Sequence, residues 1–263
     1  MGKKRITKMK IKLISDTHCE MLSTQQIGAI IHSMDLEDTD YFVMAGDIAD
    51  YKKTYTLVDY LQECNPDLTV IHVNGNHEYY KSYIEKQWHS YKNFHHLDRT
   101  MYIDDTQKIC FIGATLWTNF NNNNPIAMLD SKMGMNDYKY IRWNNGQSKL
   151  TPEHIYNLHI GDLKWLQLAL TEVPKDYTKI VVTHHKPYFN QGDFLDNLSY
   201  CFCSDLINEI TQWKVKPDYW FSGHTHKSDI REIDSVKYIS NQYGYYFEDE
   251  KITHYNEDLV IEL

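Results

Sequence analysis

Short apolar runs separated by amphipathic segments dominate the first part of the chain. Three runs have the length of a buried strand: residues 11–15, 41–45 and 68–73. Two segments between them carry apolar residues every three or four positions, as on one face of a helix: residues 24–34 and 54–64. Strands that alternate with helices predict an α/β fold, in which helices cover the faces of a sheet.

The same alternation continues in the second part of the chain. Further apolar runs predict strands at residues 108–117, 180–183 and 218–222. Thr151 and Pro152 predict a helix that runs to about residue 171, because Thr is a good N-cap and Pro suits the first helical position. Residues 206–213 are also expected to be helical, and the alternating tail after residue 229 predicts antiparallel strands.

Residues 118–150 break this pattern. The segment has few aliphatic runs and includes four consecutive asparagines at 121–124. Long irregular segments within a compact domain usually carry function, so we expect an insertion or lid over one edge of the sheet. Residues 1–9 include several Lys and Arg residues and are expected to form a basic leader before the first strand. The acidic residues 248–250 are expected to form a solvated turn. Without a repeat or an evident linker, residues 1–263 are expected to form a single domain.

Polar clusters follow five of the apolar runs. They contain Asp16 and His18, Asp47, Asn76 and His77, His184, and His224 and His226. In an open α/β sheet ligands bind beyond the carboxyl ends of the strands, so these clusters should meet in one cleft. Imidazole, carboxylate and carboxamide groups together are typical of a transition-metal site, whereas calcium prefers oxygen ligands alone.

Composition narrows the classes of partner. The 27 Lys and Arg residues against 36 Asp and Glu residues give a net charge of −9, which disfavours long nucleic acid and anionic membranes. No stretch approaches the roughly 20 apolar residues of a membrane span or matches a signal peptide. The five cysteines follow no zinc or disulfide spacing and indicate free thiols in a reducing compartment. We therefore expect a cytoplasmic protein; its oligomeric state is not indicated.

Five motifs follow one another along the chain: Asp16-Thr17-His18, Gly46-Asp47-Ile48-Ala49-Asp50, Gly75-Asn76-His77-Glu78, Thr183-His184-His185 and Gly223-His224-Thr225-His226. In this order they resemble the signature of the calcineurin-like metallophosphoesterase superfamily. The resemblance spans most of the chain. It implies the calcineurin-like phosphoesterase fold, a four-layer sandwich of two mixed β-sheets flanked by helices. It also implies a phosphoester hydrolase with two divalent metal ions.

The resemblance further implies which residues hold the metals. Asp16, His18 and His226 would bind the first metal. Asn76, His184 and His224 would bind the second, and Asp47 would bridge both. His185 competes with His184 for its role, but His184 directly follows the apolar run. The mixed nitrogen and oxygen donors suit Mn, Fe, Zn or Ni, with Mn or Fe favoured.

The expected mechanism uses a hydroxide that bridges the metals to attack the phosphate, with His77 as general acid to the leaving oxygen. Asp50 is expected to orient His77. Candidate substrate contacts are Arg142, His185 and Tyr188.

Two features narrow the substrate class. Tyr51-Lys52 stands where the phosphoprotein phosphatases carry Arg-Gly, and Thr-His-His-Lys-Pro at 183–187 resembles the small bacterial-type phosphodiesterases. The leading hypothesis is a phosphodiesterase or phosphatase for a small nucleotide-like ester. The alternatives are a metal-dependent nuclease on DNA or RNA, and a non-catalytic interaction scaffold of the same fold.

Overall fold

The computed structural model describes residues 8–34, 36–190, 195–248 and 253–263. Most of the expected leader, residues 1–7, and residues 249–250 of the acidic run lie outside the described residues. Within the described part, no helix is both long enough and apolar enough to cross a lipid bilayer.

The first sheet has five strands in the order β14-β1-β2-β3-β5. Its members are β1 (Lys10–Ile14), β2 (Tyr41–Ala45), β3 (Thr69–Val73), β5 (Phe94–His96) and β14 (Ile261–Glu262). Strands β1, β2, β3 and β5 are parallel to one another, and β14 pairs with β1 antiparallel. The sheet is therefore mixed.

The second sheet has six strands in the order β12-β13-β11-β10-β7-β6. Its members are β6 (Thr100–Asp104), β7 (Ile109–Ala114), β10 (Thr178–Thr183), β11 (Tyr219–Phe221), β12 (Asp229–Ile233) and β13 (Val236–Ser240). The central strands are parallel, whereas β6 and β12 pair antiparallel with their neighbours. The antiparallel pair expected in the tail is present as β12 and β13.

The two sheets pack face to face through alternate residues of their strands. Ile11 and Leu13 of β1 and Val43 of β2 meet Phe111 of β7 and Val182 of β10 in one buried cluster. Alternation follows from the strand geometry, because successive side chains point to opposite faces. The residues between them face outward and pack under helices, which explains why every residue of β2 is buried.

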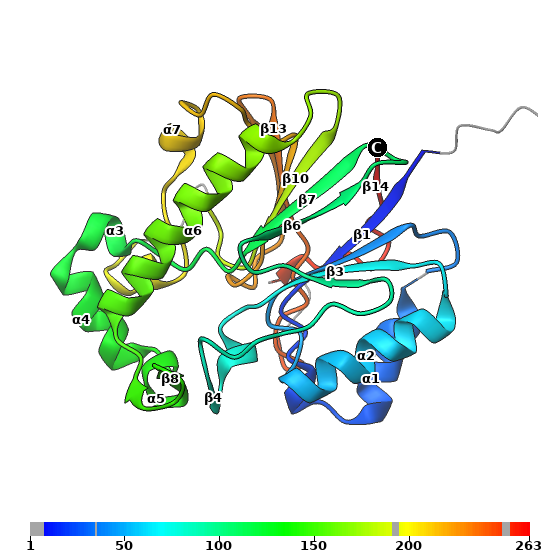
Figure 1. The fold of residues 1–263 in the computed structure, drawn as a ribbon. Helices are drawn as coiled ribbons and strands as arrows, with labels where there is room; N and C mark the ends of the chain where they lie inside the picture. The colour runs from blue at the N-terminus through cyan, green and yellow to red at the C-terminus, as the bar shows by residue number, and fades with distance from the viewer. Residues whose placement is uncertain (1–7, 35, 191–194, 249–252) are drawn as a thin grey trace, which may run out of the picture.

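Helices cover the outer faces of both sheets (Figure 1). The first sheet is covered by α1 (Thr24–Ser33) and α2 (Tyr51–Cys64), and the second by α6 (Pro152–Glu172) and α7 (Ile207–Ile210). Thr151 caps α6 as its sequence predicts, and Asp50 caps α2 by accepting the amide of Lys53. The four-layer sandwich expected from the sequence is confirmed.

Residues 118–150 are more regular than their sequence predicts. They contain α3 (Phe120–Asn123), α4 (Pro125–Gly134), α5 (Asp137–Tyr140), β8 (Ile141–Trp143) and β9 (Ser148–Lys149). With β4 (Ser82–Tyr83), the last two form a small third sheet. The segment has its own apolar cluster, where Phe120, Ala127 and Ile141 pack with Trp117. Four of these pieces have only two to four residues, and α4 buries only Ala127, Met128 and Ser131, so no broad apolar face stands out in the sequence.

Three 3₁₀ helices complete the described elements: η1 (Cys19–Met21), η2 (His77–Tyr79) and η3 (Leu198–Cys201). η2 follows β3 and carries the predicted site residue His77, whereas η1 follows β1 and begins directly after His18.

A glycine permits the close approach of the two sheets. A Cβ atom at Gly113 of β7 would lie 2.4 Å from Cβ of Leu97 and 2.8 Å from Cγ1 of Val73. We predict that Gly113→Ala destabilises the protein by about 1–3 kcal/mol, because the sheets must separate or repack. Gly28→Ala is the control, since a Cβ there meets no atom within 4 Å. Urea denaturation measures both; equal midpoints for the two variants would contradict this account of the interface.

Candidate active site

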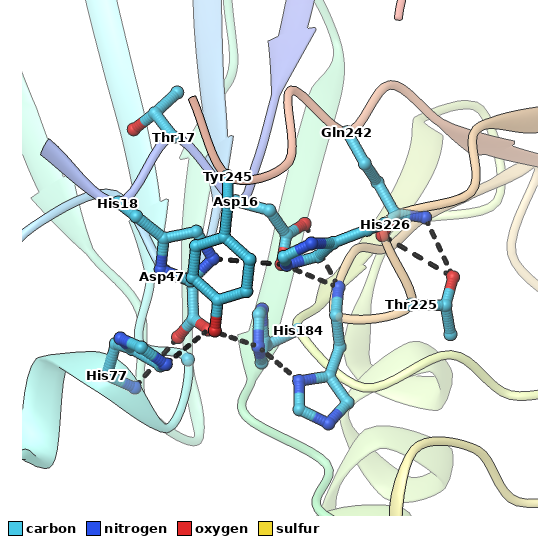
Figure 2. Close-up of polar contacts among 12 residues, drawn as sticks. Asp16, Thr17, His18, Asp47, His77, His184, Thr225, His226, Gln242 and Tyr245 are labelled. Carbon is cyan, nitrogen blue, oxygen red and sulfur yellow. Dashed lines mark hydrogen bonds and ion pairs between the residues drawn. The ribbon is translucent and has the colours of Figure 1, made fainter. Parts of the chain in front are cut away.

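The predicted site residues meet where strands from both sheets end (Figure 2). The first sheet supplies those that follow β1, β2 and β3, and the second sheet those that follow β10 and β11. The structure brings together all seven predicted metal ligands and His77: Asp16, His18, Asp47, Asn76, His77, His184, His224 and His226. The sheets are also linked directly here, because Ala45 O accepts from Nδ1 of His184 at 2.9 Å.

Sharp backbone turns aim these side chains inward. Five of the residues have positive φ angles: Asp16 (58°), His18 (46°), Asp47 (53°), His224 (74°) and His226 (51°). The left-handed region costs a non-glycine residue free energy, so such a conformation persists only where surrounding contacts enforce it. One such contact is the bond from the His224 amide to the Asp16 carboxylate, at 3.0 Å. Strain concentrated in this way is typical of a functional site.

Asp16, His18 and His226 form the first group of ligand atoms. Nε2 of His18 lies 3.1 Å from Nε2 of His226, which is 3.6 Å from Oδ1 of Asp16. Three atoms with lone pairs thus face one point, and all lie within 4.8 Å of one another. Such a set fits a divalent cation, whose charge would offset the burial of the carboxylate.

Asp47, His184 and His224 form the second group. Nε2 of His184 lies 3.4 Å from Oδ2 of Asp47 and 3.0 Å from Nδ1 of His224. Oδ1 of Asn76 joins them, 3.2 Å from the same nitrogen. The Asn76 amide nitrogen donates to Asp137 at 2.9 Å, which turns its oxygen toward the group. These donors fit a second cation.

Asp47 is an anion in this setting. Burial opposes its ionisation, but the adjacent His184 and His77 rings hold the pKa of Asp47 well below its usual value. Oδ1 of Asp47 accepts a hydrogen bond from the backbone amide of His77 at 2.8 Å. Asp47 therefore connects the loop after β2 to the loop after β3.

Outer contacts fix the orientation of the histidines. Oε2 of Glu248 lies 2.6 Å from Nδ1 of His226, and Oε1 of Glu20 lies 3.5 Å from Nδ1 of His18. With Nδ1–H of His226 donating to Glu248, Nε2 of that ring is left with its lone pair toward the centre. Glu78 secures the backbone, because its carboxylate accepts the amides of Asp47, Ile48 and Gly75 at 2.7–2.9 Å.

His77 lies beside the second group. Its Nε2 is 4.0 Å from Oδ2 of Asp47, and its ring stacks on Tyr80 with centroids 4.2 Å apart. Nδ1 lies 2.8 Å from Oε1 of Glu20. Burial lowers the pKa of His77, but the carboxylates of Asp47 and Glu20 outweigh it and raise that pKa to about 9.

The expectation that Asp50 orients His77 is corrected by the structure. Asp50 is exposed and its carboxylate caps α2, while Glu20 makes the contact with Nδ1 of His77. Asp50 is connected to this region only indirectly, because it accepts a hydrogen bond from the Lys53 amide. The Lys53 ammonium in turn donates to the carbonyl oxygens of Cys19 and Glu20 at 3.0 Å.

A cavity of about 580 Å³ opens over the two groups. Asp47, Asn76, His77, His224 and His226 lie on its floor. Its walls include the following residues: Tyr80, Gly134, Met135, Asn136, Phe189, Leu195, Ser199, Phe202, Cys203, Thr225, Lys227, Tyr245 and Glu248. Gly134, Met135 and Asn136 belong to residues 118–150, so that segment does border the site.

The three predicted substrate contacts are not among the described residues that line this cavity. Arg142 lies on β8 with an exposed side chain. His185 is buried, with Nδ1 3.4 Å from Thr115 O and its ring against Trp117. Tyr188 is buried and its hydroxyl donates to Asp229 at 3.0 Å. His185 and Tyr188 are thus engaged by other residues, and Arg142 is exposed on β8 outside the cavity lining, which corrects the expectation.

Sequence reasoning missed several residues that shape the site. Glu20 extends the pattern Asp-x-His to Asp-x-His-x-Glu, a signal that could have indicated it. Asp137 and Tyr245 carried no local signal, since each comes from a distant segment. Glu248 binds a metal-ligand candidate across 22 residues and is more than the solvated turn that its acidic neighbours suggested.

Comparison with known proteins agrees with this geometry. An uncharacterized protein of Acanthamoeba polyphaga mimivirus is 25% identical over 264 residues, which cover 89% of this chain and 91% of that protein. A probable cyclic nucleotide phosphodiesterase of Rhodopseudomonas palustris is 31% identical over 85 residues, or 30% of this chain and 29% of that protein.

The crystal structure of phosphopantetheinyl hydrolase from Mycobacterium tuberculosis shares the fold. Its TM-score is 0.69 at 14% identity, over 97% of this chain and 96% of that one. The sequence model of the calcineurin-like phosphoesterase family matches residues 9–228, which include every motif described above. The chain therefore belongs to the calcineurin-like phosphoesterase family and is a metal-dependent phosphoester hydrolase.

Proposed function

We propose that this chain is a phosphodiesterase or phosphatase that uses two divalent metals to hydrolyse a small nucleotide-like ester. The observation that carries the proposal is the convergence of two groups of ligand atoms on the floor of one cavity. The first group, Asp16, His18 and His226, would hold one metal. Asn76, His184 and His224 would hold the other, with Asp47 between them.

The donor set supports Mn or Fe, because it mixes imidazole with carboxylate and carboxamide oxygen. When bound, two such cations supply Lewis acidity that activates water and neutralises charge on the phosphate. The protein contributes orientation. Glu248 holds His226 by its Nδ1 atom, so that Nε2 is presented without rearrangement. Oε1 of Glu20 lies 3.5 Å from Nδ1 of His18.

His77 is suited to protonate the leaving oxygen. Its Nδ1 contacts Glu20, and its Nε2 faces the same cavity as Asp47. A carboxylate partner fixes the tautomer and stabilises the charged ring, so the proton to be donated is carried on Nε2. His77 need not bind a metal to act in this way.

The cavity suits a small ester. Its size is within the range of small-molecule sites, and Met135, Phe189, Leu195 and Phe202 give it an apolar wall. Lys227 is the one Lys or Arg among the described residues that line it. A nucleic-acid backbone needs several cations along its path, so a polymer is disfavoured. The similarity to a probable cyclic nucleotide phosphodiesterase, although limited to 85 residues, supports a nucleotide-like ester.

We infer a cytoplasmic location. All five cysteines are free, and four of them are buried. Unpaired thiols fit a reducing compartment.

The test is a panel of phosphate monoesters, phosphodiesters and short oligonucleotides. Each is assayed after chelation and again after Mn, Fe, Zn or Ni is returned singly. We expect hydrolysis of small esters that is lost with chelation and depends weakly on salt. Preferential, steeply salt-sensitive cleavage of oligonucleotides would favour the nuclease alternative. Absence of turnover with every metal would favour a scaffold.

A second prediction concerns the general acid. We expect His77→Ala to lower kcat about 10²–10⁴-fold for alkyl phosphoesters, whose leaving oxygen needs a proton. The loss should be small for p-nitrophenyl esters, whose leaving group departs as the anion. Glu20→Gln should lose about 10-fold or more with the same dependence on leaving group.

Asp50→Asn is the matched control, because it makes the same chemical change at the other candidate partner. Asparagine also caps helices, so Asp50→Asn should leave both rates unchanged. Equal loss for both ester types in His77→Ala, or a larger effect of Asp50→Asn than of Glu20→Gln, would show that the roles are misassigned.

A further inference from the structure

Tyr245 lies over the two groups of ligand atoms (Figure 2). Its ring stacks on His18 with centroids 4.3 Å apart and planes inclined by 25°. It meets His226 edge-on at 4.7 Å, and its centroid is 6.3 Å from that of His77. It also lines the cavity. The aromatic ring is thus fixed against one candidate ligand from each sheet.

The hydroxyl of Tyr245 points into the site. Figure 2 shows it directed toward the side on which Asp47 and His184 lie. Among the described residues, none is hydrogen-bonded to this hydroxyl. Tyr80, whose ring stacks on His77, differs because its hydroxyl donates to Asp137 at 2.8 Å. Of these two phenols, only that of Tyr245 has a proton available to a ligand in the cavity.

The loop that carries Tyr245 is tied to a candidate metal ligand. Its backbone amide donates to Oε2 of Glu248 at 2.8 Å, and that same oxygen lies 2.6 Å from Nδ1 of His226. Gly244 allows the turn, since its φ is +82° and a Cβ there would lie 2.4 Å from Oε2 of Glu248. The next residue, Tyr246, is 59% exposed and does not line the cavity.

These contacts place a neutral hydrogen-bond donor at a fixed position beside the reaction centre. A phenol with a pKa near 10 keeps its proton at neutral pH. Donors that are already oriented stabilise charge that develops on phosphate oxygens, and they act most strongly in a cavity with little water. The His77 imidazolium is a stronger acid than a phenol and is assigned to protonate the leaving oxygen. The Tyr245 hydroxyl can therefore donate a hydrogen bond to a non-bridging oxygen.

We propose that Tyr245 is a catalytic residue whose hydroxyl donates a hydrogen bond to a non-bridging phosphate oxygen of the substrate. This inference rests on the proposed function, because it requires a phosphoester in the cavity. The stacked ring sets the position of the hydroxyl, and Glu248 couples that position to His226.

Tyr245→Phe tests the proposal, since it keeps the ring and removes only the hydroxyl. In the Mn-loaded protein we expect kcat/KM to fall about 10–100-fold, as for the loss of a hydrogen bond to a charged group. The loss should be equal for bis(p-nitrophenyl) phosphate and for an alkyl phosphodiester. Binding of inorganic phosphate, followed by calorimetry, should weaken about 10-fold or more. Metal content should stay as in the wild type, and Tyr246→Phe should change none of these quantities.

Three results would overturn the proposal. The first is Tyr245→Phe with unchanged phosphate affinity and unchanged kcat/KM. The second is loss of metal from Tyr245→Phe, which would make the phenol a metal ligand. The third is a loss confined to poor leaving groups, which would make it the acid. If the wild type hydrolyses no ester, the proposed function fails and with it the catalytic role, while the phosphate affinities of the wild type and Tyr245→Phe still test whether the hydroxyl donates to a phosphate oxygen.

Discussion

Buried lone pairs that face one another constrain the whole site. Asp16 and Asp47 are carboxylates with 0% and 2% exposure, and His184 beside them is fully buried. Carboxylates removed from water need compensating positive charge, and the described residues around them offer imidazole rings rather than Lys or Arg side chains. Divalent cations would meet that need. The strand ends of both sheets, and the strained turns after them, are arranged around this requirement.

A second layer of carboxylates makes the arrangement rigid. Glu78 holds three backbone amides of the loops after β2 and β3, and Glu20 links His18 to His77. Glu248 holds both His226 and the backbone of Tyr245. Each of these residues joins two functional groups, so a change at one of them would be felt at both. A site held in this way needs little reorganisation during the reaction.

The sequence predicted the sheets and the ligand set well because both follow local rules. Buried strands have short apolar runs, and residues just after parallel strands meet at one edge. The partner of His77 did not follow such a rule. Asp50 lies three residues after Asp47 in the same motif, but Asp50 caps α2 and its carboxylate accepts a hydrogen bond from the Lys53 amide. Glu20 lies in η1, 57 residues before His77 in the sequence, and contacts it only through the fold.

The remaining errors share one cause, since they depend on contacts between distant segments. Arg142 and Tyr188 have suitable chemistry, but β8 and Asp229 hold them away from the cavity. The helices within residues 118–150 are stabilised by packing on Trp117 rather than by their own periodicity. Tyr245 enters the site through Gly244 and Glu248, which no spacing in the sequence indicates.

The number of metals bound by the wild type and by Asp47→Ala tests the central claim most directly. Elemental analysis after equilibrium dialysis against Mn²⁺ gives that number, and circular dichroism shows whether each protein is folded. We predict two metals per chain for the wild type and fewer than two for folded Asp47→Ala, because Asp47 should bind both. Two metals in folded Asp47→Ala, or none in the wild type, would contradict the account.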